Sequence, residues 1–231
     1  MTHDKITDRI TDQLSDPTGA MAEATISHLG ELRDRFAERA TTAGLVDVGY
    51  RTVDSPFGPL LVAATAVGVV RIAFDMEGHD AVLATLAERI SPRIIRPTGG
   101  LGAASTLDDA ARELTEYFDG RRQRFALPLD LRLTRGFRRS VVEHLPEIGY
   151  GRTASYAAIA AAVGHPAAVR AVGSACATNP LPVVIPCHRV VRSDGTIGAY
   201  LGGSDAKRAL LSMEHASAEY RPAEAPARRA H

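Results

Sequence analysis

The spacing of apolar residues changes along this chain from a β pattern to a helical one, and this change restricts its fold more than any other feature. Between residues 50 and 74, short apolar runs alternate with turn residues, which predicts a meander of short strands. Ser55-Pro-Phe-Gly58 and Val67-Gly68 are the expected turns. From Gly136 onward the chain is rich in alanine, and apolar residues recur at helical spacing. Strands followed by helices predict an α+β domain and then a mainly α domain.

Two helices are expected in the first domain. Residues 78–90 carry apolar side chains on one helical face. A second helix is expected from Thr106, where Thr106 and Asp109 have the spacing of a capping box, to Gly120, which would end it. With the strands, these helices complete a small α+β unit.

The second domain is expected to contain a pair of short helices. An amphipathic helix over residues 137–145 precedes them. Ser155 is the expected N-cap of a helix over residues 155–162, and residues 167–177 form the next helix. A tight turn containing Gly164 joins the two, which is typical of a helix-turn-helix.

Composition places the domain boundaries and the class of protein. With 231 residues, the chain is long enough for two small domains. We expect a helical or partly disordered extension over 1–45, the α+β domain over 46–134, the helical domain over 135–215 and a disordered tail over 216–231. No run approaches the roughly 18 apolar residues of a membrane span, and the polar N-terminus is unlike a secretory signal. A cytoplasmic location is therefore expected.

Charge is distributed unevenly, although Lys and Arg balance Asp and Glu at 27 each. Residues 1–134 contain 15 basic and 20 acidic side chains, a net charge of −5, whereas residues 135–215 contain 9 and 5, a net charge of +4. Contacts with phosphate groups, if the chain makes any, are expected in the second of these segments.

The segment from Asn179 to Val191 is the strongest candidate for chemistry. Three apolar residues, Val183 to Ile185, predict a strand that would place Cys187 at its end, beside His188. The thiolate is the nucleophilic form of cysteine, and a free thiol has a pKa of about 8.5. Lowering that pKa by about 1.5 units would ionise about half of the thiol at neutral pH, for about 2 kcal/mol. His188 could accept the proton.

Several readings of this segment remain open on residue patterns alone. A carboxylate that orients His188 could be Asp194, Asp205 or Glu214. Cys187 could also be a small buried residue, which is the favoured reading for Cys176 in its alanine-rich helix. Two cysteines are too few for a disulfide framework or a cysteine-rich zinc site, so no metal is expected.

Pro186-Cys187-His188-Arg189-Val190-Val191 resembles the active-site signature of the methylated-DNA–protein-cysteine methyltransferases, the O6-alkylguanine-DNA alkyltransferases. The resemblance covers about residues 48–215. Its other motifs are Ser55-Pro-Phe-Gly-Pro-Leu60, Tyr117-Phe-Asp-Gly120, Tyr150-Gly151, Ser155-Tyr156, Arg170-Ala-Val-Gly173, Asn179-Pro180, Gly198-Ala-Tyr-Leu-Gly-Gly203, Lys207, Leu210-Leu211 and Glu214. It implies a ribonuclease H-like α+β N-terminal domain and a C-terminal domain with a winged helix-turn-helix.

The resemblance also implies roles for individual residues. Cys187 is the expected alkyl acceptor, His188 deprotonates it through a water, and Glu214 orients that histidine. Asn179 helps to fix the turn around the cysteine, and Tyr156 polarises the departing guanine. The implied DNA-binding and base-binding residues are Arg170, Tyr200, Gly202, Gly203, Ser155 and Arg189. Among these, the Arg170 side chain replaces the extruded nucleotide, and Tyr200 with the two glycines lines the base pocket.

By the same resemblance, the partner is double-stranded DNA that contains O6-alkylguanine, with O4-alkylthymine as a further substrate to consider. The chain would bind the minor groove as a monomer, flip the damaged base and be inactivated after one transfer, without a cofactor.

Three other classes of function share part of this sequence pattern. A non-enzymatic protein that marks lesions normally has another residue at the acceptor position, although Ala199 and Leu201 depart from the usual pocket sequence. A transcription-regulating alkyltransferase needs an additional cysteine-rich metal domain, which two cysteines cannot provide. A cysteine hydrolase would need an acyl substrate and repeated turnover.

Overall fold

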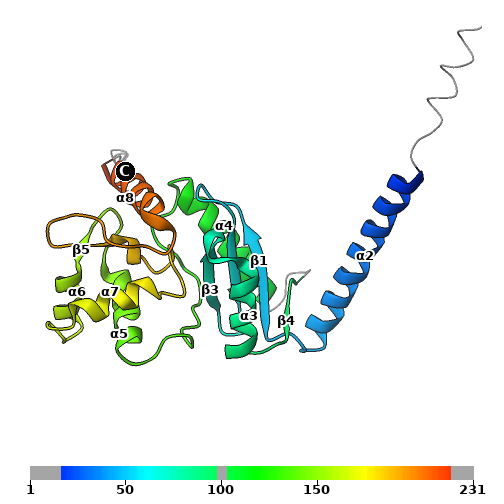
Figure 1. Cartoon of the computed structure of the whole chain (residues 1–231), viewed down its shortest axis with the longest axis horizontal. Helices are drawn as coiled ribbons and strands as arrows, with labels where there is room; N and C mark the ends of the chain where they lie inside the picture. The colour runs from blue at the N-terminus through cyan, green and yellow to red at the C-terminus, as the bar shows by residue number, and fades with distance from the viewer. Residues whose placement is uncertain (1–16, 98–102, 220–231) are drawn as a thin grey trace, which may run out of the picture.

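The computed structural model describes residues 17–97 and 103–219. Figure 1 shows two units side by side, with one long helix projecting from the first of them. The first unit is a small sheet with helices, and the second is mainly helical. The predicted order of an α+β domain followed by an α domain is confirmed.

The sheet of the first unit has the strand order β3-β2-β1-β4. β1 (Val48–Val53), β2 (Leu60–Ala64) and β3 (Val69–Phe74) form the expected antiparallel meander. β4 (Ile94–Ile95) pairs in parallel with β1. At two residues, β4 is too short to leave a periodic pattern in the sequence.

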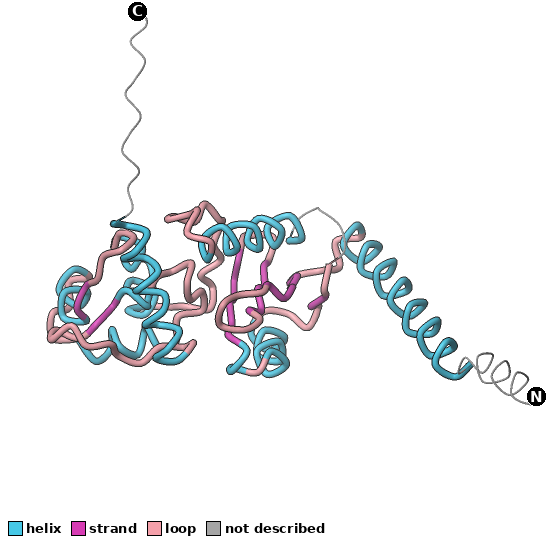
Figure 2. The backbone as a smooth tube through the Cα atoms, turned by 90° about the horizontal axis from the view of Figure 1, so that it is seen from above, coloured by secondary structure: helices cyan, strands magenta, loops and turns pink. Residues whose placement is uncertain are grey.

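Both faces of the sheet are covered, which explains why all five residues of β2 are buried. Leu61 and Ala63 face α3 (His79–Arg89), while Leu60 and Val62 face the cluster that includes α4 (Ala103–Phe118). Seen from above, one helix lies on each side of the strands (Figure 2). Two covered faces produce a continuous apolar strand rather than an alternating one.

α4 begins earlier than its sequence indicated. The helix starts at Ala103, so Thr106 lies inside it and is not its cap. Ala104 and Leu107 are buried on the apolar stripe of the helix. The helix therefore extends to the N-terminal side of Thr106, because packing outweighs local capping preference. Gly120 follows the helix with φ of 72° and donates its N–H to the Tyr117 carbonyl, as expected of a residue that ends a helix.

The second unit is built from helices and two short strands. α5 (Gly136–His144) leads through a 3₁₀ turn (Leu145–Glu147) to the helix pair α6 (Tyr156–Ala162) and α7 (Val169–Ala177). Ser155 is the N-cap of α6, as predicted, and its Oγ accepts the Ala158 N–H at 3.0 Å. β5 (Ala154–Ser155) pairs in parallel with β6 (Val190–Val191).

The last helix, α8, spans Gly203–Glu219. It therefore includes the first four residues of the expected tail, 216–219, and the rest of that tail lies outside the described residues. The largest apolar cluster contains residues of β2, β3, α4, α5, α7 and α8, so the two units share one core.

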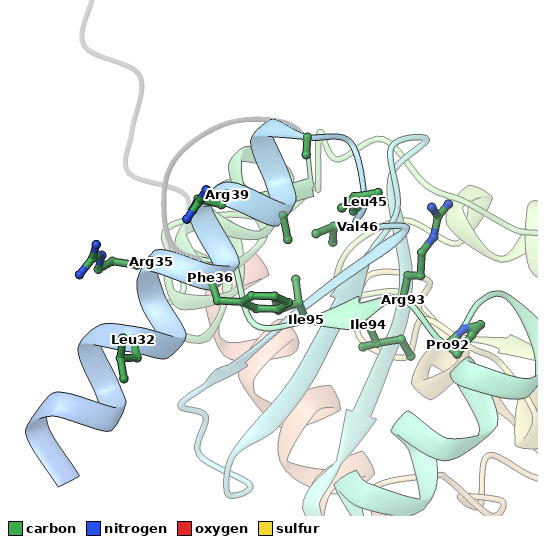
Figure 3. Close-up of a pocket in the computed structure, with 12 residues that line it drawn as sticks. Leu32, Arg35, Phe36, Arg39, Leu45, Val46, Pro92, Arg93, Ile94 and Ile95 are labelled. Atoms are coloured by element: carbon green, nitrogen blue, oxygen red, sulfur yellow. The ribbon is translucent and has the colours of Figure 1, made fainter. Parts of the chain in front are cut away.

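α2 (Pro17–Thr42) occupies the described part of the N-terminal extension. Ile6, Ile10 and Leu14, which lie four residues apart as on one face of a helix, are outside the described residues. Leu32 and Phe36 of α2 are exposed, and with Ile94 and Ile95 of β4 they line a groove of about 800 Å³, in which Phe36 lies near Ile95 (Figure 3). Among the described helices, none is long and apolar enough to cross a membrane.

Candidate active site

Cys187 follows a buried turn rather than a strand. Residues 181–185, predicted to include a strand, form a turn in which the Ile185 N–H donates to the Leu181 carbonyl at 2.8 Å. Val183 has φ of 73°, a left-handed conformation that costs about 1–3 kcal/mol outside glycine. Pro182 and Pro186 lack the N–H that a strand ladder requires. Cys187 then opens a 3₁₀ turn, Cys187–Arg189.

The Asn179 side chain holds this turn together. Its Nδ2 donates to the Ile185 carbonyl at 2.9 Å and to Cys187 Sγ at 3.1 Å, and its Oδ1 accepts the Leu181 N–H at 3.0 Å. All of these groups are buried. One amide therefore satisfies two backbone groups of the turn and sets the position of the sulfur.

Glu214 is the carboxylate that lies beside His188. Its Oε1 is 2.9 Å from His188 Nε2, and both side chains are fully buried. Of the other two candidates, Asp194 binds Thr196 and Asp205 pairs with Arg208, both at the exposed surface. The approach of α8 to the Cys187 turn therefore selects one of the three carboxylates that residue patterns alone left open, and it is the one that the family resemblance implied.

Glu214 has further partners that sequence analysis did not anticipate. Its Oε1 accepts the Tyr117 hydroxyl at 2.6 Å, and its Oε2 accepts the Gly151 N–H at 3.1 Å. Arg189 donates hydrogen bonds to both oxygens of Glu214 at 2.9 Å, and its Nη1 donates to the Ile148 carbonyl at 2.6 Å. The sequence predicted that Arg189 contacts DNA. In the structure its side chain is only 8% exposed and is bound to these internal acceptors, so it points into the protein and not toward the surface.

Burial governs the ionisation of the three central groups. It would raise the pKa of Glu214, but hydrogen bonds from His188 and Arg189 prevail and lower that pKa to about 2. Burial lowers the pKa of His188 in spite of Glu214, so its imidazole is neutral. An ionised carboxylate only accepts hydrogen bonds, so Nε2, which faces it, is the ring nitrogen that carries the proton. Nδ1 is buried without a hydrogen-bond partner in the described part of the chain.

The resting thiol is protonated, contrary to the expected lowering of its pKa. Burial raises the pKa of Cys187 to about 11, and the hydrogen bond from Asn179 and the nearby Lys207 ammonium oppose that rise only in part. Cys187 is 1% exposed. Lys207 is itself fully buried, with Nζ 2.6 Å from the Val190 carbonyl and 5.9 Å from the centre of the Tyr156 ring.

The remaining predicted site residues occupy the surroundings of this cluster. Tyr156 opens α6 and is partly buried, and a Cβ added at Gly198 would lie 2.4 Å from its hydroxyl. Tyr200 packs edge-on against His188, with ring centres 6.2 Å apart, and its buried hydroxyl has no hydrogen-bond partner among the described residues. Arg170 lies apart from the cluster, on the exposed face of α7.

The two glycines predicted in the base pocket differ in their surroundings. A Cβ at Gly202 would lie 2.7 Å from the Phe74 ring, so this position admits no larger residue without movement of the core. Gly203 has φ of 84° at the start of α8. Ser155 uses its hydroxyl to cap α6.

Comparisons with known proteins agree across both units. Residues 48–131 match the family model described as "6-O-methylguanine DNA methyltransferase, ribonuclease-like domain", and residues 136–216 match "6-O-methylguanine DNA methyltransferase, DNA binding domain". The methylated-DNA–protein-cysteine methyltransferase of Mycobacterium tuberculosis is 39% identical over 174 residues, which cover 74% of this chain and 94% of that relative.

Solved structures give the same result. The O6-methylguanine methyltransferase of Mycobacterium tuberculosis superposes with a TM-score of 0.63 at 34% identity, covering 77% of this chain and 96% of the other. A second structure from that organism, an OGT in complex with DNA, gives a TM-score of 0.60 at 35% identity, with 73% and 94% covered.

Proposed function

The chain belongs to the family of methylated-DNA–protein-cysteine methyltransferases, and from this premise we propose that it repairs DNA by moving an alkyl group from O6-alkylguanine to Cys187. One observation carries the assignment of the acceptor. Cys187 Sγ lies in a turn fixed by Asn179, next to a neutral His188 whose Nε2 is held by Glu214. The orientation leaves Nδ1 of His188 free to accept a proton.

The transfer step balances with these groups alone. The Cys187 thiol proton passes to His188 Nδ1, directly or through one water, as the sulfur attacks the alkyl carbon. A carbon–sulfur bond forms, the bond between that carbon and guanine O6 breaks, and the electron pair stays on the base. The Tyr156 hydroxyl would stabilise the developing charge on the guanine, whose leaving ability is otherwise poor. A thioether does not hydrolyse, so each molecule reacts once.

DNA is the proposed partner because a relative of this chain was solved in complex with DNA. Guanine O6 within a base stack is out of reach of an in-line attack, so the base must be flipped, which costs a few kcal/mol. Arg170 is exposed on the second helix of the α6–α7 pair and could fill the vacated stack. We propose binding through the minor groove by a single copy of the chain.

Entry of a purine requires the site to open. Cys187 is 1% exposed, and Tyr156 and Tyr200 lie in its immediate surroundings. The residues that cover the sulfur must therefore move aside when the flipped base arrives. Closure in the free protein, together with the raised pKa of the thiol, would protect Cys187 from other electrophiles.

Intact-mass analysis after incubation with an O6-methylguanine duplex tests the proposal. We expect each molecule to gain one methyl group, located by peptide mapping at Cys187, and Cys187→Ser to gain none. Cys176 serves as an internal control, because burial raises its pKa to about 12 and it should remain unmodified. Tight binding to the lesion without any gain in mass would instead favour a protein that only marks the damage.

A further inference from the structure

The Tyr117 hydroxyl connects the first unit to the reacting groups of the second. Tyr117 is in the last turn of α4 and is fully buried. Its hydroxyl lies 2.6 Å from Glu214 Oε1 and 3.4 Å from His188 Nε2. No other side chain described in residues 46–134 has a hydrogen bond to the Cys187, His188 and Glu214 group.

The direction of these hydrogen bonds follows from the charge on Glu214. With its pKa lowered to about 2, the carboxylate is ionised and only accepts hydrogen bonds, so the phenol donates to it. Burial and the Glu214 charge raise the pKa of Tyr117 far above its ordinary value, which keeps the phenol a donor at every working pH. The lone pairs of the phenol oxygen therefore face His188 Nε2.

This arrangement determines the tautomer of His188. Two polar atoms among the described residues lie near Nε2, namely Oε1 of Glu214 and the phenol oxygen of Tyr117. Both act as acceptors toward Nε2, so Nε2 must carry the hydrogen. Nδ1 is left unprotonated and can serve as the base. A phenol that turned its hydrogen toward Nε2 would favour the opposite tautomer, in which Nδ1 could not accept the thiol proton.

We propose that Tyr117 is a positioning residue for the transfer reaction, through which the first unit holds Glu214 and His188 in the reactive arrangement. The inference rests on the proposed function, because it concerns the proton that Cys187 loses. Tyr117 does not touch the substrate. It acts through Glu214 Oε1, whose charge it shares with His188 and Arg189.

Tyr117→Phe tests this, with Tyr150→Phe as the matched control. Tyr150 packs against Tyr117 with ring centres 6.2 Å apart, and its buried hydroxyl has no hydrogen-bond partner among the described residues. Both variants lose one buried hydroxyl in the same aromatic cluster, and only the first loses a bond to Glu214. The measurements are the single-turnover rate of methyl transfer at saturating duplex from pH 5 to pH 9, and the dissociation constant for the duplex.

For Tyr117→Phe we expect about a tenfold lower rate on the plateau, equivalent to about 1.4 kcal/mol, close to the lower end of the range for a hydrogen bond to a charged group. The acid limb of the pH–rate profile should move to higher pH. Without the hydrogen bond from the phenol, more negative charge remains on Glu214 Oε1, and this charge raises the pKa of His188. The dissociation constant should stay within about twofold, and Tyr150→Phe should match the parent.

Equal profiles for Tyr117→Phe and Tyr150→Phe would overturn the inference, as would a loss confined to DNA binding. Failure of the parent chain to transfer methyl would instead overturn the proposed function. Should Tyr117→Phe not fold, 3-fluorotyrosine incorporated at position 117 keeps the ring and makes the phenol a stronger donor. The acid limb should then move to lower pH, and an unchanged limb would count against the proposal.

Discussion

Replacing Glu214 by glutamine should be among the most destabilising single-atom changes available in this protein. The carboxylate accepts hydrogen bonds from Tyr117, His188, Arg189 and the Gly151 backbone within 3.1 Å. Glutamine has one acceptor oxygen and one NH₂ group, so some of these donors would face another donor. Arg189 would also keep its buried charge without a counter-ion.

Two estimates of the cost agree. A pKa of about 2 in place of the ordinary 4.5 corresponds to about 3 kcal/mol of folding stability above pH 5, at about 1.4 kcal/mol for each pH unit. Breaking a buried ion pair by removing one partner typically costs about 3–5 kcal/mol. For a domain pair of this size, a loss of about 3–5 kcal/mol would lower the midpoint of thermal unfolding by about 6–20 °C.

The dependence on pH has a definite sign. Because folding lowers the pKa of Glu214, its contribution is complete above the unfolded-state pKa of 4.5 and disappears as the pH falls toward 2. The difference in unfolding free energy between the parent and Glu214→Gln should therefore be largest at pH 7 and shrink between pH 5 and pH 2. Urea unfolding followed by circular dichroism at several pH values measures it.

Glu143→Gln provides the matched control. Glu143 pairs with Arg139 at 2.8 Å on an exposed helix face, where such pairs contribute about 0.3–0.5 kcal/mol. We expect a change in this range with little dependence on pH. A loss below about 1 kcal/mol at pH 7 for Glu214→Gln, or one that is equal at pH 7 and pH 3, would refute the reasoning about the buried carboxylate.

Four further outcomes are expected. Iodoacetamide should alkylate Cys187 of the free protein at pH 7.5 at least about a hundredfold more slowly than a free cysteine, as peptide mapping would measure, because burial raises its pKa to about 11. Asn179→Ala should lose about 2–6 kcal/mol in urea unfolding, since two buried backbone groups lose their partner. Gly198→Ala should slow methyl transfer at least about tenfold in single-turnover assays, because its Cβ would displace the Tyr156 hydroxyl. Phe36→Ser should leave the transfer rate unchanged and should change the unfolding free energy by no more than about 0.5 kcal/mol, because this side chain is 68% exposed on α2, away from Cys187.

The elements that were predicted correctly depend on local rules. The meander, the Ser155 cap and the Gly120 helix end each follow from a few neighbouring residues. The strand predicted before Cys187 was wrong because an apolar run is equally suited to a buried turn, and two prolines with Asn179 favour the turn. The start of α4 was misplaced because packing on the sheet extends the helix past Thr106.

The surroundings of His188 could be predicted only in part. The adjacent cysteine and histidine suggested a nucleophile and a base, and the family motif singled out Glu214. Tyr117 is 71 residues from His188 in sequence and belongs to the other unit, so no spacing rule connects them. Arg189 is next to His188, yet its side chain turns inward to Glu214 rather than toward DNA.

The amino-acid sequence by itself determined the two-unit architecture, the family and the proposed acceptor thiol with its neighbouring imidazole, because each depends on periodicity or on a motif of adjacent residues. Tertiary structure alone decided which groups surround them and in which protonation state. Burial depends on every element packed around a group, and it raises the pKa of Cys187 against the expectation from its neighbours. Long-range contacts such as the one between Tyr117 and Glu214 exist only once α4 and α8 have packed into the shared core.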